Sequence, residues 1–202
     1  MEIPVFARLG LVYAHLLLCV FALHTVLSLD WRLLHSRISA RELERRHRTV
    51  IWLLAGLWLS GLLVTGIDLD FNPGLLLNKP KLIAKLGCVT MLTLNGVLMH
   101  AWCMPRLAGR SPLRRGEAVA LLLAGGFSTV SWLMAAFFGI ARPLATWPVA
   151  GLLGLWAAAL LVAVPVALIL ADRLYRRRQG REQAPALALV EASGTDAMRA
   201  AA

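Results

Sequence analysis

The chain has 202 residues, of which 59% are hydrophobic, and its mean hydropathy is +0.70. A soluble domain of this length is roughly 45–50% apolar, so the composition excludes an ordinary soluble domain and favours a protein whose solvent is the lipid bilayer. The formal net charge of +10 would suit a nucleic-acid-binding protein. However, the arginines fall in short clusters between apolar runs, and we therefore expect no nucleic-acid partner.

Five apolar segments are long enough to cross a hydrocarbon core of ~30 Å, which takes about 20 helical residues. They cover residues 5–29, 50–67, 82–104, 118–140 and 147–171. The first exceeds the roughly 7–15 apolar residues of a signal peptide, so we expect it to be retained. The sequence thus predicts an all-α bundle of about five transmembrane helices over residues 1–180. Residues 181–202 lack aromatic residues and a sustained period, which predicts a disordered tail.

Lys and Arg concentrate in the segments that follow the first, third and fifth spans. These segments carry Arg32, Arg37, Arg41, Arg45, Arg46, Arg48, Arg106, Arg110, Arg114, Arg115, Arg173, Arg176, Arg177, Arg178 and Arg181. The opposite side carries Arg8, Lys79, Lys81 and Arg142. Positively charged loops tend to stay in the cytoplasm, so the loops 30–49 and 105–116 are predicted to be cytoplasmic. This orientation places the N-terminus outside and the C-terminus in the cytoplasm of a bacterium, with the protein in its inner membrane.

Ionisable side chains within the spans are the candidates for function, because each costs free energy in the bilayer. They are His15, His24, Lys85 and His100. The acidic residues fall at or beyond the span ends, which disfavours a proton-coupled pump and a dicarboxylate metal site. His35 and His47 lie in the arginine-rich loop and are expected to be exposed. Cys19, Cys88 and Cys103 have no metal-site or disulfide spacing and are interpreted as small buried residues.

Two pairs of these residues could ligate the iron of one haem. His24 and His100 each lie about five residues from the predicted cytoplasmic end of their span, and therefore at a similar depth of ~7 Å. His15 and Lys85 lie farther toward the outside. His15 and His24 are nine residues apart, which places them on opposite faces of one helix, so they cannot serve one site together. A hydrogen-bonded His15 and a Lys85 that extends to the interface are the alternatives to ligation.

Part of the chain resembles the bacterial membrane protoporphyrinogen oxidase family and the wider group of small helical membrane proteins that includes the copper-resistance D-type proteins. The resemblance covers residues 10–105. It consists of a His in the first span, Leu43-Glu44-Arg45-Arg46 before the second, Gly56-Leu57-Trp58 within the second, and a Lys opening the third. In the oxidase family such a His and Lys are associated with b-type haem, which implies His15 and Lys85 here. The family's His about eleven residues after that Lys is replaced by Gly96, and a fifth span is added, so only the haem site is carried over.

Two hypotheses of function remain. The first is a small membrane protein that binds b-type haem and acts in redox or haem-pathway chemistry, with the protein supplying the ligands and a dry pocket. The second is a non-catalytic assembly factor, partner subunit or permease, without a cofactor, whose histidines are structural. In both, the bilayer is the main surrounding of the protein. A membrane-protein partner or a second copy of the chain is left open.

Overall fold

The computed structural model describes residues 5–35, 38–108 and 114–200, with only the backbone for residue 174 and residues 177–200. Its long helices are α1 (Val5–His35), α2 (Ala40–Asp68), α3 (Pro80–Leu98), α5 (Arg115–Ile140) and α6 (Val149–Ala200). A π-helical turn, η2 (Met99–Cys103), and the short α4 (Met104–Ala108) extend α3. Two 3-10 helices, η1 (Pro73–Asn78) and η3 (Arg142–Thr146), connect the long helices at one end of the bundle.

Five of the described segments are long and apolar enough to cross a membrane: Val5–His35, Ala40–Asp68, Pro80–Leu107, Arg115–Ile140 and Val149–Arg173. Most of their surface faces outward, and Phe6, Trp52 and Leu161 are each more than 70% exposed. In water this much exposed apolar surface would be costly, whereas lipid tails solvate it. The prediction of an all-α bundle with about five helices long and apolar enough to span a membrane is therefore confirmed.

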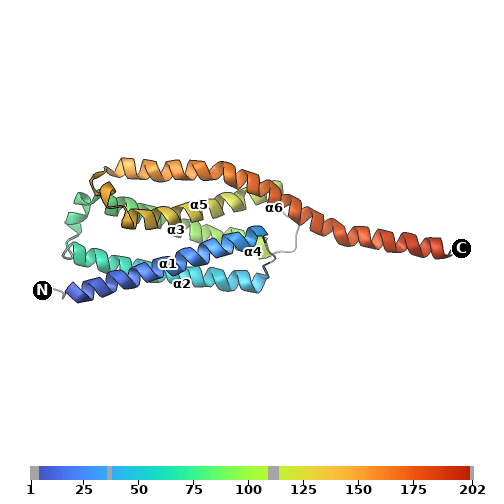
Figure 1. The fold of residues 1–202 in the computed structure, drawn as a ribbon, viewed down its shortest axis with the longest axis horizontal. Helices are drawn as coiled ribbons and strands as arrows, with labels where there is room; N and C mark the ends of the chain where they lie inside the picture. Colours follow the sequence, from blue (N-terminus) through green and yellow to red (C-terminus); the bar gives the residue numbers. More distant parts are fainter. Residues whose placement is uncertain (1–4, 36–37, 109–113, 201–202) are drawn as a thin grey trace.

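The helices form two groups (Figure 1). α1 packs along α2, and α5 packs along both α3 and α6. A layer of buried side chains from α1, α2, α3 and α5 joins the two groups near the middle of the bundle, and it consists of Ala22, Val26, Leu57, Leu92 and Trp132. We call this set the central layer. Side-chain hydrogen bonds between described residues also cross between the groups. Trp58 Nε1 donates to Thr93 Oγ1 over 2.9 Å, and the Thr129 hydroxyl donates to the Asp30 carboxylate.

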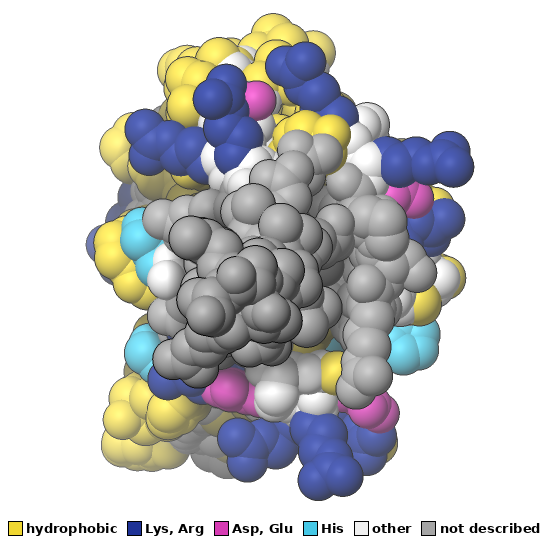
Figure 2. Space-filling model, turned by 90° about the vertical axis from the view of Figure 1, so that its right-hand side faces the viewer, with side chains coloured by type: hydrophobic (Ala, Val, Ile, Leu, Met, Phe, Trp, Pro, Cys, Tyr) yellow, Lys and Arg dark blue, Asp and Glu magenta, His cyan; other side chains and the backbone are white. Residues whose placement is uncertain are grey.

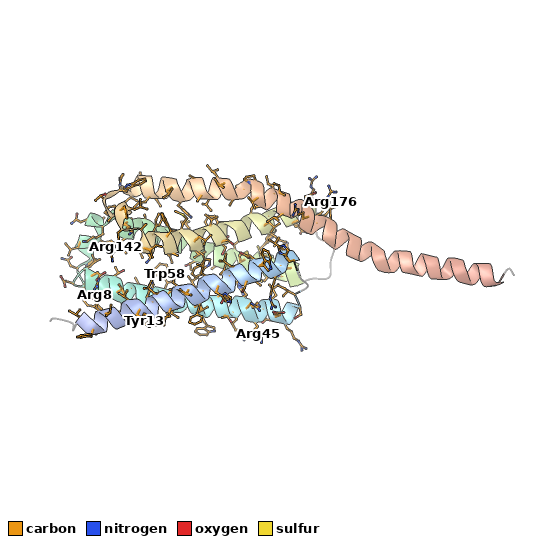
Figure 3. All side chains as sticks on the ribbon, viewed as in Figure 1. Arg8, Tyr13, Arg45, Trp58, Arg142 and Arg176 are labelled. Carbon is orange, nitrogen blue, oxygen red and sulfur yellow. The ribbon has the colours of Figure 1, made fainter. Side chains whose placement is uncertain are left out.

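The charged residues gather at the two ends of the bundle. Figure 3 shows Arg8 and Arg142 at the end that holds η1 and η3, and Arg45 and Arg176 at the opposite end. We call these the η1 end and the arginine-rich end. Figure 2 views the molecule from the arginine-rich end and shows Lys and Arg side chains around its rim. The arginine-rich segments therefore share one end, as their alternation along the sequence requires.

Helices α1 and α2 extend beyond the predicted spans, so most of the predicted loop 30–49 is helical. α1 continues to His35, and α2 begins at Ala40 because Ser39 caps it, accepting a hydrogen bond from Glu42 N over 3.2 Å. This arrangement matches the S-x-x-E signal of a helix start. Arg32 pairs with Glu42 across the two helices. Polar residues thus continue both helices past the apolar segments that end at residue 29 and begin at residue 50.

The connection after α2 is tight. Asp70 and Phe71 adopt φ values of 49° and 54°, in the left-handed region, and Phe71 N donates to Gly66 O over 2.7 Å. The Phe71 ring lies over Gly66, where an added Cβ would come within 2.8 Å of it. The Asn72-Pro73-Gly74 turn predicted from the sequence follows, with the Asn72 side chain accepting from Gly74 N.

The last helix includes most of the segment 181–202. α6 continues to Ala200, and Figure 1 shows its C-terminal part extending away from the bundle. Residues 201–202 lie outside the described part of the chain. An isolated helix in water is marginally stable because its nucleation is costly, so packing must supply most of a helix's stability. The backbone of this extension is helical, but Figure 1 shows no neighbouring helix beside it.

Candidate functional site

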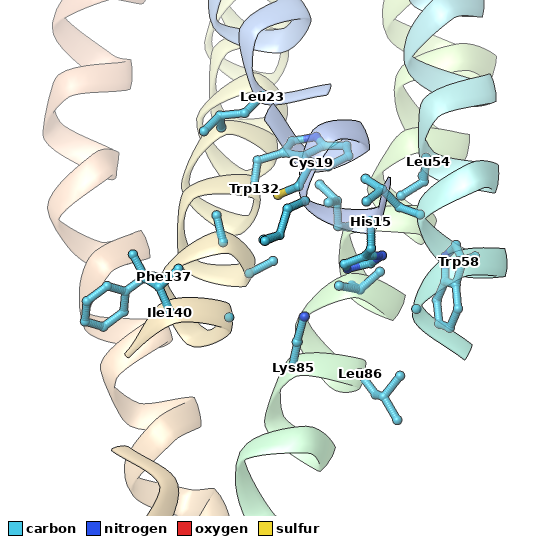
Figure 4. A pocket seen from close by; sticks show the side chains of 18 of the residues that line it. His15, Cys19, Leu23, Leu54, Trp58, Lys85, Leu86, Trp132, Phe137 and Ile140 are labelled. Carbon is cyan, nitrogen blue, oxygen red and sulfur yellow. The ribbon is translucent and has the colours of Figure 1, made fainter. Parts of the chain in front are cut away.

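A cavity of about 380 Å³ lies between the two groups of helices, among α1, α2, α3 and α5. Its size falls within the usual range of ligand pockets, roughly 300–1,000 Å³. Apolar side chains form most of its wall, and Leu57, Leu92 and Trp132 of the central layer also line it. Polar groups are few, and the two basic ones are His15 and Lys85. In Figure 4 these two side chains reach the same space from α1 and α3.

The position of His15 follows from its contacts with α2. Its Nδ1 lies 2.8 Å from Ser60 Oγ. Ser60 Oγ in turn lies 2.7 Å from Gly56 O. A carbonyl oxygen only accepts, so the Ser60 hydroxyl donates to Gly56 and its oxygen accepts the proton of His15 Nδ1. The hydrogen-bond pattern thus assigns the proton of the neutral ring to Nδ1 and leaves a free lone pair on Nε2.

Gly61 allows the imidazole to lie this close to α2. A Cβ added to Gly61 would lie 3.2 Å from His15 Cε1, which is tighter than an ordinary contact. One turn earlier, the space beside Gly56 is taken by Leu18 at 3.4 Å. The small residues of α2 therefore let α1 approach closely, as small residues do between membrane helices. Their structural role here is to seat His15 and Leu18.

Lys85 enters the cavity from α3. Its Nζ lies beside α5, 4.0 Å from where a Cβ on Gly139 would stand. Among the described residues, no hydrogen bond or ion pair involves Lys85, and no Asp or Glu lines the cavity. Lys81, one turn earlier, differs because its Nζ donates to Ala141 O over 2.7 Å. Lys81 thus closes the η1 end of the α3–α5 pair, whereas Lys85 faces a largely apolar cavity that His15 and Cys19 also line.

The other predicted pair is placed differently. His24 is exposed on α1 and does not line the cavity. His100 lies in the π-helical turn η2, is also exposed, and has its ring nearly parallel to that of His47, with 5.2 Å between ring centroids. The cavity therefore brings together His15 and Lys85 and does not include His24 or His100.

His47 was misplaced in the sequence analysis, and Asp30 was not singled out there. His47 was expected to be exposed, but it is 8% exposed, and its Nε2 is buried without a hydrogen-bond partner among the described residues. The expectation was wrong because α2 already begins at Ala40, which places His47 on a packed helix one turn after buried Leu43. Asp30 lies within α1 and accepts a hydrogen bond from Thr129 of α5. The i, i+4 spacing of buried Ala22 and Val26 with Asp30 is the signal that could have placed it on the inner face.

The three cysteines are free thiols in the structure. Cys88 and Cys103 are fully buried, as expected for small core residues. Cys19 is half-buried and lines the cavity one turn from His15. Within the described residues, no group of three or more His, Cys, Asp or Glu side chains is arranged to hold a metal ion.

Comparison of the chain with the models of known protein families, with curated proteins and with solved structures found no match. The site must therefore be interpreted from its own geometry.

Proposed function

We propose that this membrane protein binds b-type haem in the cavity, with His15 as an axial ligand of the iron. The observation that carries the proposal is the hydrogen-bond chain from His15 Nδ1 through Ser60 to Gly56, which leaves Nε2 with a free lone pair at an apolar cavity. Histidines that ligate metals usually donate their other ring N–H to a neighbouring acceptor, which fixes the tautomer and the ring orientation. Ser60 supplies this acceptor.

The other lining residues suit a flat, largely apolar cofactor with acidic groups. Trp58 and Trp132 contribute aromatic surface, and the leucines exclude water. Lys85 is close enough to interact with the same ligand, either at the iron as a neutral amine or at a carboxylate as a cation. Of the two predicted pairs, the geometry favours His15 with Lys85. Bound haem would supply one-electron redox chemistry, while the chain would hold it, orient it and exclude water.

A reduced-minus-oxidised absorption spectrum of the purified protein, produced with ample haem, tests the proposal. We expect a b-type spectrum in the unmodified protein and its loss in His15→Ala. His24→Ala and His100→Ala are matched controls, because both residues are exposed and lie outside the cavity. Retention of the spectrum in His15→Ala with its loss in the two control variants would assign the haem to the other pair.

A cofactor-free membrane protein is the second candidate, and the same hydrogen bond favours it. Because Ser60 satisfies His15 Nδ1, the imidazole can also serve only to join α1 to α2. Absence of any haem spectrum from the unmodified protein would support this function. In that case the fall in thermal stability of His15→Ala in detergent would measure the structural role of the ring.

A further inference from the structure

The cavity contains a basic side chain, Lys85, without an acidic partner in the described part of the chain. Lys85 reaches an apolar space whose lining contains no acidic residue, and among the described residues it has no ion pair or hydrogen bond. A cation in such surroundings is costly unless a counter-charge accompanies it. Lys81 on the same helix at least has a hydrogen-bond acceptor, the Ala141 carbonyl, which lowers this cost. The missing partner of Lys85 is therefore expected to come from a ligand.

One side of the cavity opens between α1 and α5. Leu16 and Val20 of α1 line the cavity, yet they are 48% and 63% exposed. Facing them, Phe137 and Ile140 of α5 line it as well and are 42% and 71% exposed. Figure 4 shows Phe137 and Ile140 on the side of the cavity away from Trp58. All four residues are apolar and lie in candidate membrane spans, so this opening faces lipid.

The remaining sides are closed by contacts between helices. His15 and Ser60 join α1 to α2, and Trp58 spans from α2 to Thr93 of α3, although Leu62 beside it is exposed. Between α3 and α5, the Lys81, Cys88 and Asn95 side chains each donate to a backbone carbonyl; these are the carbonyls of Ala141, Ser131 and Ala124.

The side between α1 and α5 differs, because the described side-chain hydrogen bond between these helices lies away from the cavity opening. This bond joins Thr129 to Asp30. These residues lie beyond the central layer, toward the arginine-rich end, one turn past Trp132 and Val26. The stretch between that layer and the η1 end has no such bond among the described residues and is where the four exposed apolar residues lie.

We propose that Lys85 binds the carboxylate of a lipid-soluble molecule, and that this molecule enters the cavity from the bilayer between α1 and α5. The inference shares the cavity with the proposed haem site and deepens it. Two sources can supply the carboxylate, a haem propionate or a long-chain carboxylic acid. The Lys85 ammonium binds the carboxylate, while the apolar remainder of the molecule occupies the space among Leu23, Leu54 and Trp132.

The charge requirement is tested with matched pairs of ligands and of variants. Wild-type protein in phosphatidylcholine vesicles is titrated with parinaric acid and its methyl ester, followed by energy transfer from tryptophan, and with haem and its dimethyl ester, followed by absorbance. Lys85→Met is expected to weaken binding of at least one acid by about tenfold or more, as expected for a lost charge-assisted hydrogen bond. It should leave binding of the corresponding ester unchanged. Lys81→Met, on the same helix but outside the cavity, should change neither.

Substitutions at the rim of the opening test whether ligands enter between α1 and α5. Val20→Trp places a large side chain at the opening, and we expect it to slow association of the bound acid several-fold. Val162→Trp on α6 is the control, because Val162 is 71% exposed and does not line the cavity. Leu16→Trp provides a second rim variant. Circular dichroism of each variant verifies its helical content, which should not change because these side chains are exposed.

The results separate this inference from the haem proposal. If the protein has no haem spectrum but binds parinaric acid in a Lys85-dependent manner, the inference holds and the haem proposal fails. The role of Lys85 would be overturned by a different pattern. In that pattern haem binding depends on His15 but is equally tight in Lys85→Met and in wild type, and parinaric acid binds the two proteins equally or binds neither of them. Association rates that are equal in both rim variants and the Val162→Trp control would overturn lateral access.

Discussion

The distance between α1 and α2 at His15 depends on a single missing methyl group. We predict that Gly61→Ala displaces the imidazole, because the new Cβ would lie 3.2 Å from His15 Cε1 while Ser60 holds the adjacent Nδ1 atom by a hydrogen bond. The expected result is a loss of stability of about 1–3 kcal/mol, typical of overpacking, and, if the proposed haem is bound, its weaker or altered binding. Thermal unfolding in detergent and the haem spectrum measure both effects.

Gly87→Ala is the control for this change. It also adds a methyl group to a helical glycine, but nothing lies within 4 Å of the position. Because Ala favours a helix over Gly, this control should be neutral or slightly stabilising. Equal behaviour of the two variants would mean that the close approach of His15 to α2 is not important for the site.

The sequence identified His15 and Lys85 because ionisable residues are rare within apolar spans. It could not choose between them and the pair His24 and His100, since depth along a helix says nothing about which face is buried. Helix rotation decides which pair of side chains faces the cavity, and this rotation depends on small residues of the neighbouring helix. Gly61 and Ser60 of α2 determine where the His15 ring lies, although neither would stand out in a search for ligands.

At the scale of elements, the hydrogen bond between Asp30 and Thr129 joins the two groups of helices. We predict that Thr129→Val destabilises the protein by about 1–3 kcal/mol, because the half-buried carboxylate loses its donor. Thr90→Val on the exposed face of α3 is the matched control and should change the free energy of unfolding little. A similar effect of both substitutions on thermal unfolding would show that the contact between α1 and α5 does not stabilise the bundle.

The helix count and approximate spans could be predicted because hydropathy reports directly on lipid contact. The helix ends could not, because polar residues continue α1 to His35 and begin α2 at Ala40. A hydropathy criterion ends a helix where the apolar residues end, whereas the backbone continues to form hydrogen bonds in the headgroup region. The capping sequence from Ser39 to Glu42 carried the missing information for His47. For Asp30 the information lay in its i, i+4 spacing from Ala22 and Val26.

The extension of α6 leads to a third prediction. Deletion of residues 181–202 is expected to leave membrane insertion and thermal stability in detergent unchanged. Figure 1 shows no helix of the bundle beside this part of α6. Arg173 and Arg176 remain in the truncated chain and preserve the charge at this end. A large fall in the unfolding temperature on truncation would indicate that the extension packs against the bundle.

At the scale of the whole molecule, the structure shows which segments share an end of the bundle, but not which side of the membrane that end faces. The arginines that follow the first, third and fifth spans must lie at one end of a five-helix bundle, and the structure places Arg45 and Arg176 there (Figure 3). The geometry is the same whichever side of the membrane this end occupies. The side is therefore determined by the membrane and its insertion machinery, through the distribution of positive charge.

We predict that the arginine-rich end is cytoplasmic. Fusions of alkaline phosphatase, which is active only outside the cytoplasm, should be inactive at Arg41 and active at Asn72, with the complementary pattern for a cytoplasmic reporter. A fusion at Arg110, which lies outside the described residues, should behave like that at Arg41. The physical reason is the excess of arginine in the short segments at this end, opposed at the η1 end by a few basic residues, of which Arg8 pairs with Asp68. Phosphatase activity at Arg41 without activity at Asn72 would reverse the orientation while leaving the bundle and its cavity intact.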